Sequence, residues 1–169
     1  MEQEGRTLAS SSAGSTQQDL ARQFGWEIVA TSMHLQEIRN FWAKAVGVSG
    51  PQWTILSALS ELDKGEGVPV KAVANMLHVD SSFVTAQSKL LEKKGYVRRK
   101  TSASDARVVQ MSLSDKSCKQ FAGLSSQQEE LNNFIFGILS DAELSAFTDK
   151  LANINRRLEK ARLKVRVDI

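Results

Sequence analysis

The first long patterned stretch of this chain, residues 19–46, has the periodicity of a helix. Its apolar side chains, Phe24 and Ile28 among them, recur every three or four residues, which gathers them on one helical face. The pattern stops at 47–51, where Gly and Pro residues stand, and Pro suits the first position of a helix. We therefore expect one helix over 19–46 and a second over 51–62.

A pair of shorter helices is predicted next. Residues 68–70 (VPV) read as a short extended piece, and 71–79 carry an apolar helical face. A tight turn at 79–82 offers Asp80 or Ser81 as a helix cap. The following helix is expected over 81–94 and to end at Gly95, a common C-terminal stop.

The period then changes from helical to extended. Residues 96–100 and 107–113 are strand-like, and the polar loop between them makes a two-stranded hairpin. Helices are expected over 115–137 and 140–163, the second opening with a Ser-x-x-Glu capping box. The fold class is therefore mainly α with a small β-hairpin wing.

Two short helices joined by a tight turn and followed by a hairpin form a winged helix-turn-helix, here over 51–113. Long helical segments, 19–50 and 114–169, flank it, and they carry more apolar surface than the small central module can cover. Residues 1–18 are rich in Ser, Gly, Gln and Thr, which favours a disordered tail.

Positive charge concentrates in the central module. The chain has a net charge of +3, whereas residues 64–119 hold eleven Lys or Arg against five Asp or Glu. A basic module between more acidic arms favours phosphate neutralisation on DNA. The alternative is a solvated surface with chance clustering of charge.

Several classes of protein are disfavoured. Cys118 is the only cysteine, so a disulfide within the chain and a four-cysteine zinc site are excluded, and a reducing cytoplasm fits best. We favour a passive thiol there over a redox sensor. His34 and His78 are too few for a convincing metal site. We find no phosphate loop, nucleophile elbow, secretory signal or bilayer-spanning run, and so expect no enzyme and no cofactor.

The helix over 81–94 is the predicted recognition helix, because a helix of ~10–12 Å diameter fits the major groove. Val84, Leu91 and either Ser88 or Gln87 should face inward. The outward face should present Ser81, Ser82, Thr85, Ala86 and Lys89.

Three motifs in this region resemble the MarR family of regulators. The recognition helix ends in Leu91-Glu92-x-x-Gly95-x-Val97, the wing carries Asp105-x-Arg107, and the second wing strand runs into Ser-Leu-Ser-Asp. The resemblance extends, more weakly, over about residues 20–165. Ala86 and Leu90 depart from it, since relatives often carry polar or basic residues there.

The resemblance implies that Arg107 reaches the minor groove while Asp105 holds the wing tip. A narrow minor groove concentrates negative potential, which a pre-oriented guanidinium can read. The alternative is that the two residues only stabilise the turn. Arg98 and Ser104 complete the predicted DNA-binding set. The flanking helices would form a dimerisation lobe, so that a homodimer binds a palindromic operator.

Many members of the family are released from DNA by aromatic acids or related metabolites. The first two helices supply candidate ligand residues, with Arg39 able to anchor a carboxylate or the phosphates of a coenzyme A thioester. They are Trp26, His34, Arg39, Trp42 and Trp53. Such aromatic residues are more often core. The sequence thus predicts a ligand-responsive repressor, and the alternatives are a regulator without an effector or a winged-helix protein–protein adaptor.

Overall fold

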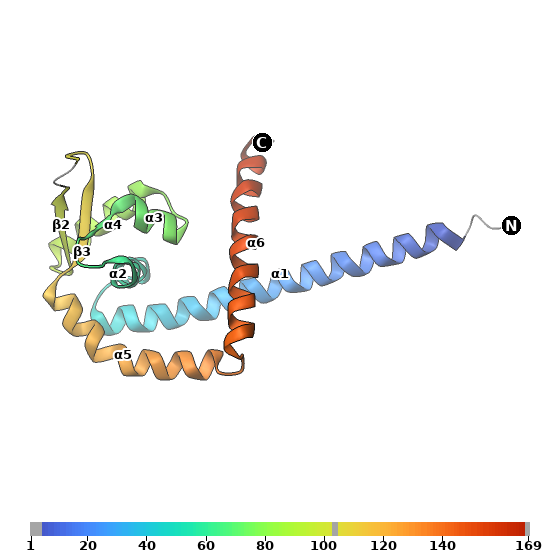
Figure 1. Cartoon of the computed structure of the whole chain (residues 1–169), viewed down its shortest axis with the longest axis horizontal. Helices are drawn as coiled ribbons and strands as arrows, with labels where there is room; N and C mark the ends of the chain where they lie inside the picture. The colour runs from blue at the N-terminus through green and yellow to red at the C-terminus, as the bar shows by residue number, and fades with distance from the viewer. Residues whose placement is uncertain (1–4, 103–104, 168–169) are drawn as a thin grey trace. The chain divides into compact units, whose positions relative to one another are not determined.

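The computed structural model describes residues 5–102 and 105–167, and these form helices and one small sheet (Figure 1). Contacts divide the chain into two compact units, Met1–Gln120 and Phe121–Ile169. The predicted fold class, mainly α with a small β wing, is confirmed. The elements are α1 (Gly5–Val46), α2 (Gly50–Leu62), β1 (Val68–Pro69), α3 (Val70–Leu77), α4 (Ser81–Lys93), β2 (Val97–Thr101), β3 (Val109–Leu113), α5 (Asp115–Phe136) and α6 (Asp141–Val167).

Helix α1 begins earlier than the sequence predicted. We expected a disordered tail over 1–18, but the helix already starts at Gly5, and residues 1–4 lie outside the described residues. Nucleating a helix is the costly step, whereas each added residue contributes one hydrogen bond. The patterned segment after residue 19 therefore extends the helix backwards through a stretch whose composition suggested disorder.

The sheet has one strand more than the predicted hairpin. Strands β2 and β3 pair antiparallel, with Arg99 opposite Met111, and β1 pairs with the other side of β3, with Val68 opposite Met111. Pro69 lies in the short edge strand, which suits a residue that cannot donate a ladder hydrogen bond. The extended VPV piece therefore closes the base of the wing.

The first unit has a continuous apolar core. Helix α2 contributes Trp53, Ile55, Leu56 and Leu59, and the sheet contributes Met111, all buried. The other buried apolar side chains of this core are Trp42, Ala43, Val46, Ala58, Val68, Val73, Ala74, Val84, Leu91, Tyr96 and Val97. The C-terminal end of α1, which we had assigned to the flanking lobe, thus also packs into the winged-helix core.

A sharp reversal joins α4 to the wing. Gly95 has φ of +75°, and the amides of Gly95 and Tyr96 donate to the carbonyls of Glu92 and Leu91. Tyr96 then buries its ring, and its hydroxyl donates to the carbonyl of Val46 at 2.5 Å. The end of the recognition helix is therefore tied directly to the end of α1.

The second unit has no buried core of its own. None of the side chains of residues 121–165 is buried, although α6 carries a regular apolar stripe. The predicted capping box opens α6, because Glu143 N donates to Ser140 Oγ at 3.4 Å and Ser140 N to the Glu143 carboxylate at 2.9 Å. The Ser140 hydroxyl, which donates to the Glu143 carboxylate at 2.7 Å, and then the Ser140 backbone N–H lower the pKa of Glu143.

Across the described parts of the chain, helices long enough to cross a membrane are all too polar to do so.

The Gly95 reversal can be tested by a pair of glycine substitutions. A Cβ at Gly95 would meet no atom within 4 Å, so Gly95→Ala should destabilise only through backbone strain, by roughly 1–2 kcal/mol. Gly25, in the middle of α1, also leaves a Cβ unobstructed, and Gly25→Ala should stabilise by about 0.5–1 kcal/mol. Urea unfolding at one fixed protein concentration measures both changes, and equal effects at the two sites would contradict the proposed strain.

Candidate nucleic-acid interface

Helix α4 presents one buried face and one exposed face. Val84, Ser88 and Leu91 are buried, as predicted for the inward face. Ser81, Ser82, Ala86 and Lys89 are exposed and Thr85 is half-buried, so the predicted outward residues do lie together on the accessible side. The helix begins after Asp80, and the residue before the turn, His78, adopts the left-handed region with φ of 53°. This compact turn sets the angle between α3 and α4.

One flank of α4 is held by the start of α2. Ser49 caps α2, and the Gln52 side-chain oxygen accepts from Ser49 N at 3.2 Å and from Lys94 Nζ at 3.2 Å. An ammonium group only donates, so it fixes the Gln52 oxygen toward Lys94. The Gln52 amide nitrogen is then left to donate to Gln87 Oε1, at 3.2 Å.

The other flank of α4 is held by the wing. Arg99 of β2 lies 3.7 Å from the Glu92 carboxylate of α4, and its side chain is only 12% exposed. A guanidinium covered to this extent braces the helix against the sheet and offers little charge to a ligand. The recognition helix is thus fixed on both sides while its outward face stays open.

The tip of the wing is an Asp–Arg fork. Arg107 donates to Asp105 through Nε and Nη2, each at 3.1 Å, and through its backbone N at 2.9 Å. The side-chain hydrogen bonds, followed by the backbone one, lower the pKa of Asp105. The fork therefore persists at neutral pH and is lost only as the pH falls through that lowered pKa. The Arg107 side chain is 91% exposed, so the pair both stabilises the turn and orients a guanidinium toward solvent.

For two other residues of the predicted DNA-binding set, the structure gives less support. Arg98 pairs with Asp115 at the start of α5, with 2.6 Å between Nη2 and Oδ1, so its charge is partly satisfied within the protein. Ser104 lies outside the described residues. The DNA-binding role of both remains a prediction.

The predicted ligand residues are not brought together within this chain. Trp26 is 69% exposed and Trp53 only 3% exposed in the core. Trp26 and Trp42 stand sixteen residues apart in α1, which separates them by about 24 Å along the helix. One small ligand cannot touch both side chains within a single copy of the chain.

The remaining candidates on α1 lie near its C-terminal half. Arg39 Nε donates to the carbonyl of Leu35 in its own helix, at 3.1 Å, and His34 lies 3.9 Å from Glu37. Trp42 meets Phe41 edge to face, with ring centroids 5.2 Å apart. Arg39 therefore forms no ion pair within the described part of the chain, and Phe41 offers an exposed aromatic ring close to it in sequence.

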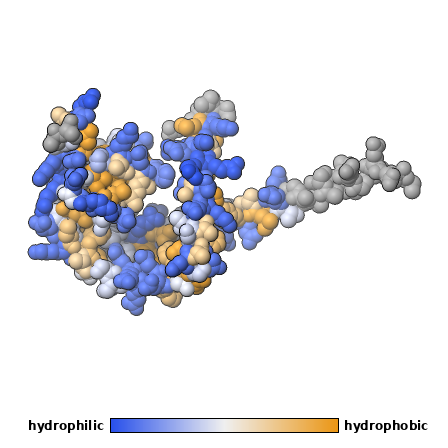
Figure 2. Space-filling model, viewed as in Figure 1, coloured by the Kyte–Doolittle hydropathy of each residue, from blue (hydrophilic) through white to orange (hydrophobic). Residues whose placement is uncertain are grey.

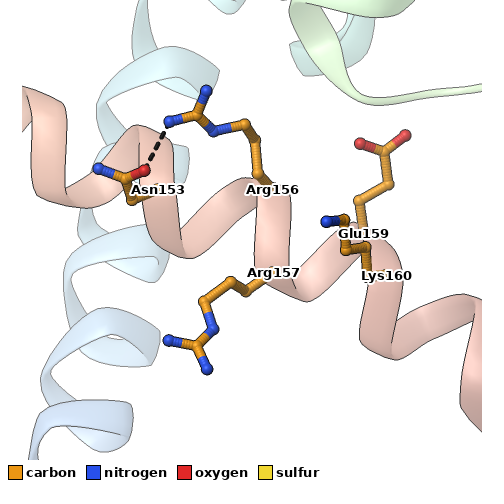
Figure 3. Close-up of a pocket in the computed structure, with 5 residues that line it drawn as sticks. All are labelled: Asn153, Arg156, Arg157, Glu159 and Lys160. Carbon is orange, nitrogen blue, oxygen red and sulfur yellow. Dashed lines mark hydrogen bonds between the residues drawn. The ribbon is translucent and has the colours of Figure 1, made fainter.

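A hollow on the surface of α6 has a different chemistry (Figure 3). Every residue that lines it is polar or charged, and the Arg156 guanidinium donates to Asn153 Oδ1 at 2.5 Å. The lining residues are Asn153, Arg156, Arg157, Glu159 and Lys160. None of them belongs to the predicted ligand set, and none is an aromatic or aliphatic residue of the kind that usually lines a site for an aromatic ligand.

Metal and thiol chemistry find little support. Among residues 5–102 and 105–167, no group of three His, Cys, Asp or Glu side chains could hold a metal ion. Cys118 is a free, exposed thiol near the start of α5. It is the only cysteine in the sequence, so no second thiol of the same chain can pair with it.

Sequence reasoning missed the residues that position α4. The Ser49-x-x-Gln52 spacing is a capping-box signal that was available in the sequence, and both of its hydrogen bonds form. The pairing of Gln52 with Gln87, across 35 residues, and that of Arg99 with Glu92 have no comparable local signal.

Comparison with known proteins agrees with this geometry. Residues 48–109 match the model of the MarR family. The HTH-type transcriptional regulator TtmR of Methylorubrum extorquens (strain PA1) is 33% identical over 110 residues, which cover 64% of this chain. The chain spans about half the length of that curated relative (53%).

Solved structures share the fold at low identity. CouR from Rhodococcus jostii RHA1, bound to p-coumaroyl-CoA, superposes with a TM-score of 0.69 and 19% identity, over 80% of this chain and 93% of CouR. The S. aureus MepR–DNA complex gives a TM-score of 0.66 and 18% identity, over 78% of this chain and 93% of MepR. The segment 48–109, which forms most of the winged helix-turn-helix, is thus similar to the MarR family.

Proposed function

We propose that this protein is a DNA-binding transcriptional regulator, acting as a homodimeric repressor on a palindromic operator. The observation that carries the proposal is the pairing of two exposed elements in one unit. The outward face of α4 offers small polar and cationic side chains, and the wing tip offers the oriented guanidinium of Arg107. Helix and wing are the elements that winged-helix proteins insert into DNA grooves.

The relatives support the same proposal. TtmR is named a transcriptional regulator, and MepR was solved in complex with DNA. The excess of basic residues in the central module adds the phosphate attraction that such binding needs. A protein–protein adaptor would not require an oriented, exposed guanidinium at the wing tip.

The homodimer is inferred from the apolar stripe of α6. Apolar residues follow one another at alternating spacings of three and four, which is the seam of a coiled coil, and most are exposed. On the face drawn in Figure 2, α6 shows both hydrophilic and hydrophobic surface. The stripe comprises Leu144, Phe147, Leu151, Ile154, Leu158, Ala161 and Val165. A helix of the second unit, which lacks a buried core, gains most by packing this stripe against a second copy.

We further propose that a small aromatic acid or its coenzyme A thioester releases the protein from DNA. CouR, which shares the fold, binds p-coumaroyl-CoA. Arg39 and the exposed ring of Phe41, which lies edge to face on the buried Trp42, provide an anion anchor and aromatic surface near one another along α1. Trp26 would join such a site only from the second copy, because it lies too far from Trp42 along the same helix.

DNA binding can be tested by fluorescence anisotropy on duplex from the promoter region of the protein's own gene. Affinity should fall steeply as salt increases, because phosphate contacts release counterions. Arg107→Ala should weaken binding by about 1–3 kcal/mol, or roughly 5- to 150-fold, while Arg22→Ala on α1 should not. Salt-independent binding, or none at low ionic strength, would favour the adaptor.

The dimer can be tested by sedimentation. Leu151→Glu places a charge in the middle of the apolar stripe and should convert the dimer to a monomer, since a buried unpaired charge costs several kcal/mol. Asn153→Glu introduces the same side chain on the opposite face of α6 and should leave the dimer intact. A monomeric parent protein, or equal dissociation of both variants, would refute the proposed seam.

The effector can be tested by thermal shift with p-coumaroyl-CoA, free aromatic acids and coenzyme A alone. A ligand at a hundred times its Kd should add about 2.7 kcal/mol of stability. Arg39→Ala should abolish the shift, whereas Arg22→Ala, which removes a guanidinium elsewhere on α1, should preserve it. No shift with any compound would leave a regulator without such an effector.

A further inference from the structure

The exposed face of α4 carries apolar side chains among its polar and cationic ones. Ala86 lies between Ser82 and Lys89 on the outward face, one helical turn from each. Leu90 follows Ala86 by one turn and is 45% exposed, and Phe83 is 40% exposed at the edge of the same face. Leu and Phe side chains on an otherwise well-packed module are left accessible at the point where a duplex would dock.

The usual hydrogen-bonding readers are missing from this face. The sequence of α4, SSFVTAQSKLLEK, contains no Arg and no Asn, which are residues that bind guanine and adenine edges in a bidentate manner. Its one Gln, Gln87, already accepts from the Gln52 amide. Since Lys94 fixes the orientation of Gln52, Gln87 is held on the flank facing α2 and is not free to read adenine.

Only one base carries a methyl group on its major-groove edge. Thymine has a C5-methyl group there, whereas the other bases are distinguished mainly by hydrogen-bond donors and acceptors. Small apolar side chains contact this methyl well, and an alanine also allows close approach of the helix backbone. A face centred on Ala86 therefore matches thymine in chemistry and size.

We infer that Ala86, with Leu90 beside it, reads thymine C5-methyl groups in each half-site of the operator. The inference rests on the proposed DNA binding and adds the base that the recognition helix selects. Lys89 and the serine hydroxyls then serve the phosphates and the remaining polar edges. Specificity at the centre of the half-site depends on burying methyl groups and only secondarily on hydrogen bonds.

The test starts with selection of bound duplexes from a random-sequence pool. The selected half-sites should contain thymine at the positions under α4, and each such thymine is then replaced by deoxyuridine, which lacks only the methyl group. Loss of one buried methyl should weaken binding about fourfold, or roughly fifteenfold when both halves of the palindrome are replaced. Deoxyuridine outside the protected footprint serves as the DNA control and should have no effect.

A protein variant shows whether Ala86 is the reader. Ala86→Ser keeps the size of the side chain nearly unchanged but replaces its apolar surface with a hydroxyl, so it should reduce the thymine-over-uracil preference toward one. Ala146→Ser, an exposed alanine of α6, is the matched control and should keep the full preference.

The possible outcomes separate this inference from the proposed function. If duplexes are selected but thymine and uracil bind equally, or if Ala86→Ser keeps the parent preference, the methyl readout is wrong and DNA binding stands. If no duplex is selected at low ionic strength, the proposed function fails, and the methyl readout fails with it.

Discussion

The reversal of the chain at Gly95 and Tyr96 is the constraint on which the DNA-binding surface depends. Gly95 accepts a left-handed backbone, which lets the chain turn from α4 into β2 within two residues. Tyr96 then bonds the carbonyl of Val46, and its own carbonyl accepts from Ser114 N and Ser117 Oγ at the start of α5. The end of α1, the end of α4, the start of β2 and the start of α5 therefore meet at Tyr96, which fixes their relative positions.

The helix and the wing tip of this DNA-binding surface are held in place in different ways. Helix α4 is held on one flank by Gln52 and on the other by Arg99, so its outward face has a single orientation relative to the sheet. The wing tip needs no such support, because Asp105 and Arg107 form their fork within one turn. Orientation of the helix is thus a property of the whole unit, whereas orientation of Arg107 is a property of three residues.

The second unit depends on association in a way that the first does not. Residues 121–165 expose apolar side chains along α5 and α6 without burying any of them. Apolar surface of this extent in a helix is stable in water only when another surface covers it. The proposed dimer would therefore complete the fold as well as present two recognition helices to one duplex.

Local features of this protein were readable from the sequence. Helical periodicity gave the buried positions Val84 and Leu91, and the Ser140–Glu143 cap and the Asp105–Arg107 motif each act over three residues or fewer. Such signals depend on neighbours in the chain, so the chain itself carries them. The resemblance to MarR regulators added the expected role of Arg107 at the wing tip.

Long-range partners were decided only by tertiary packing. The third strand, the capture of Gln87 by Gln52, the pairing of Arg98 with Asp115 and the separation of Trp26 from Trp42 follow from where elements lie in space. The hydrogen-bond partner of a polar side chain depends on which groups the packed core places beside it, and that partner can be 35 residues away in the sequence. Periodicity and caps therefore determine the elements, and packing determines which of their side chains remain free to meet DNA.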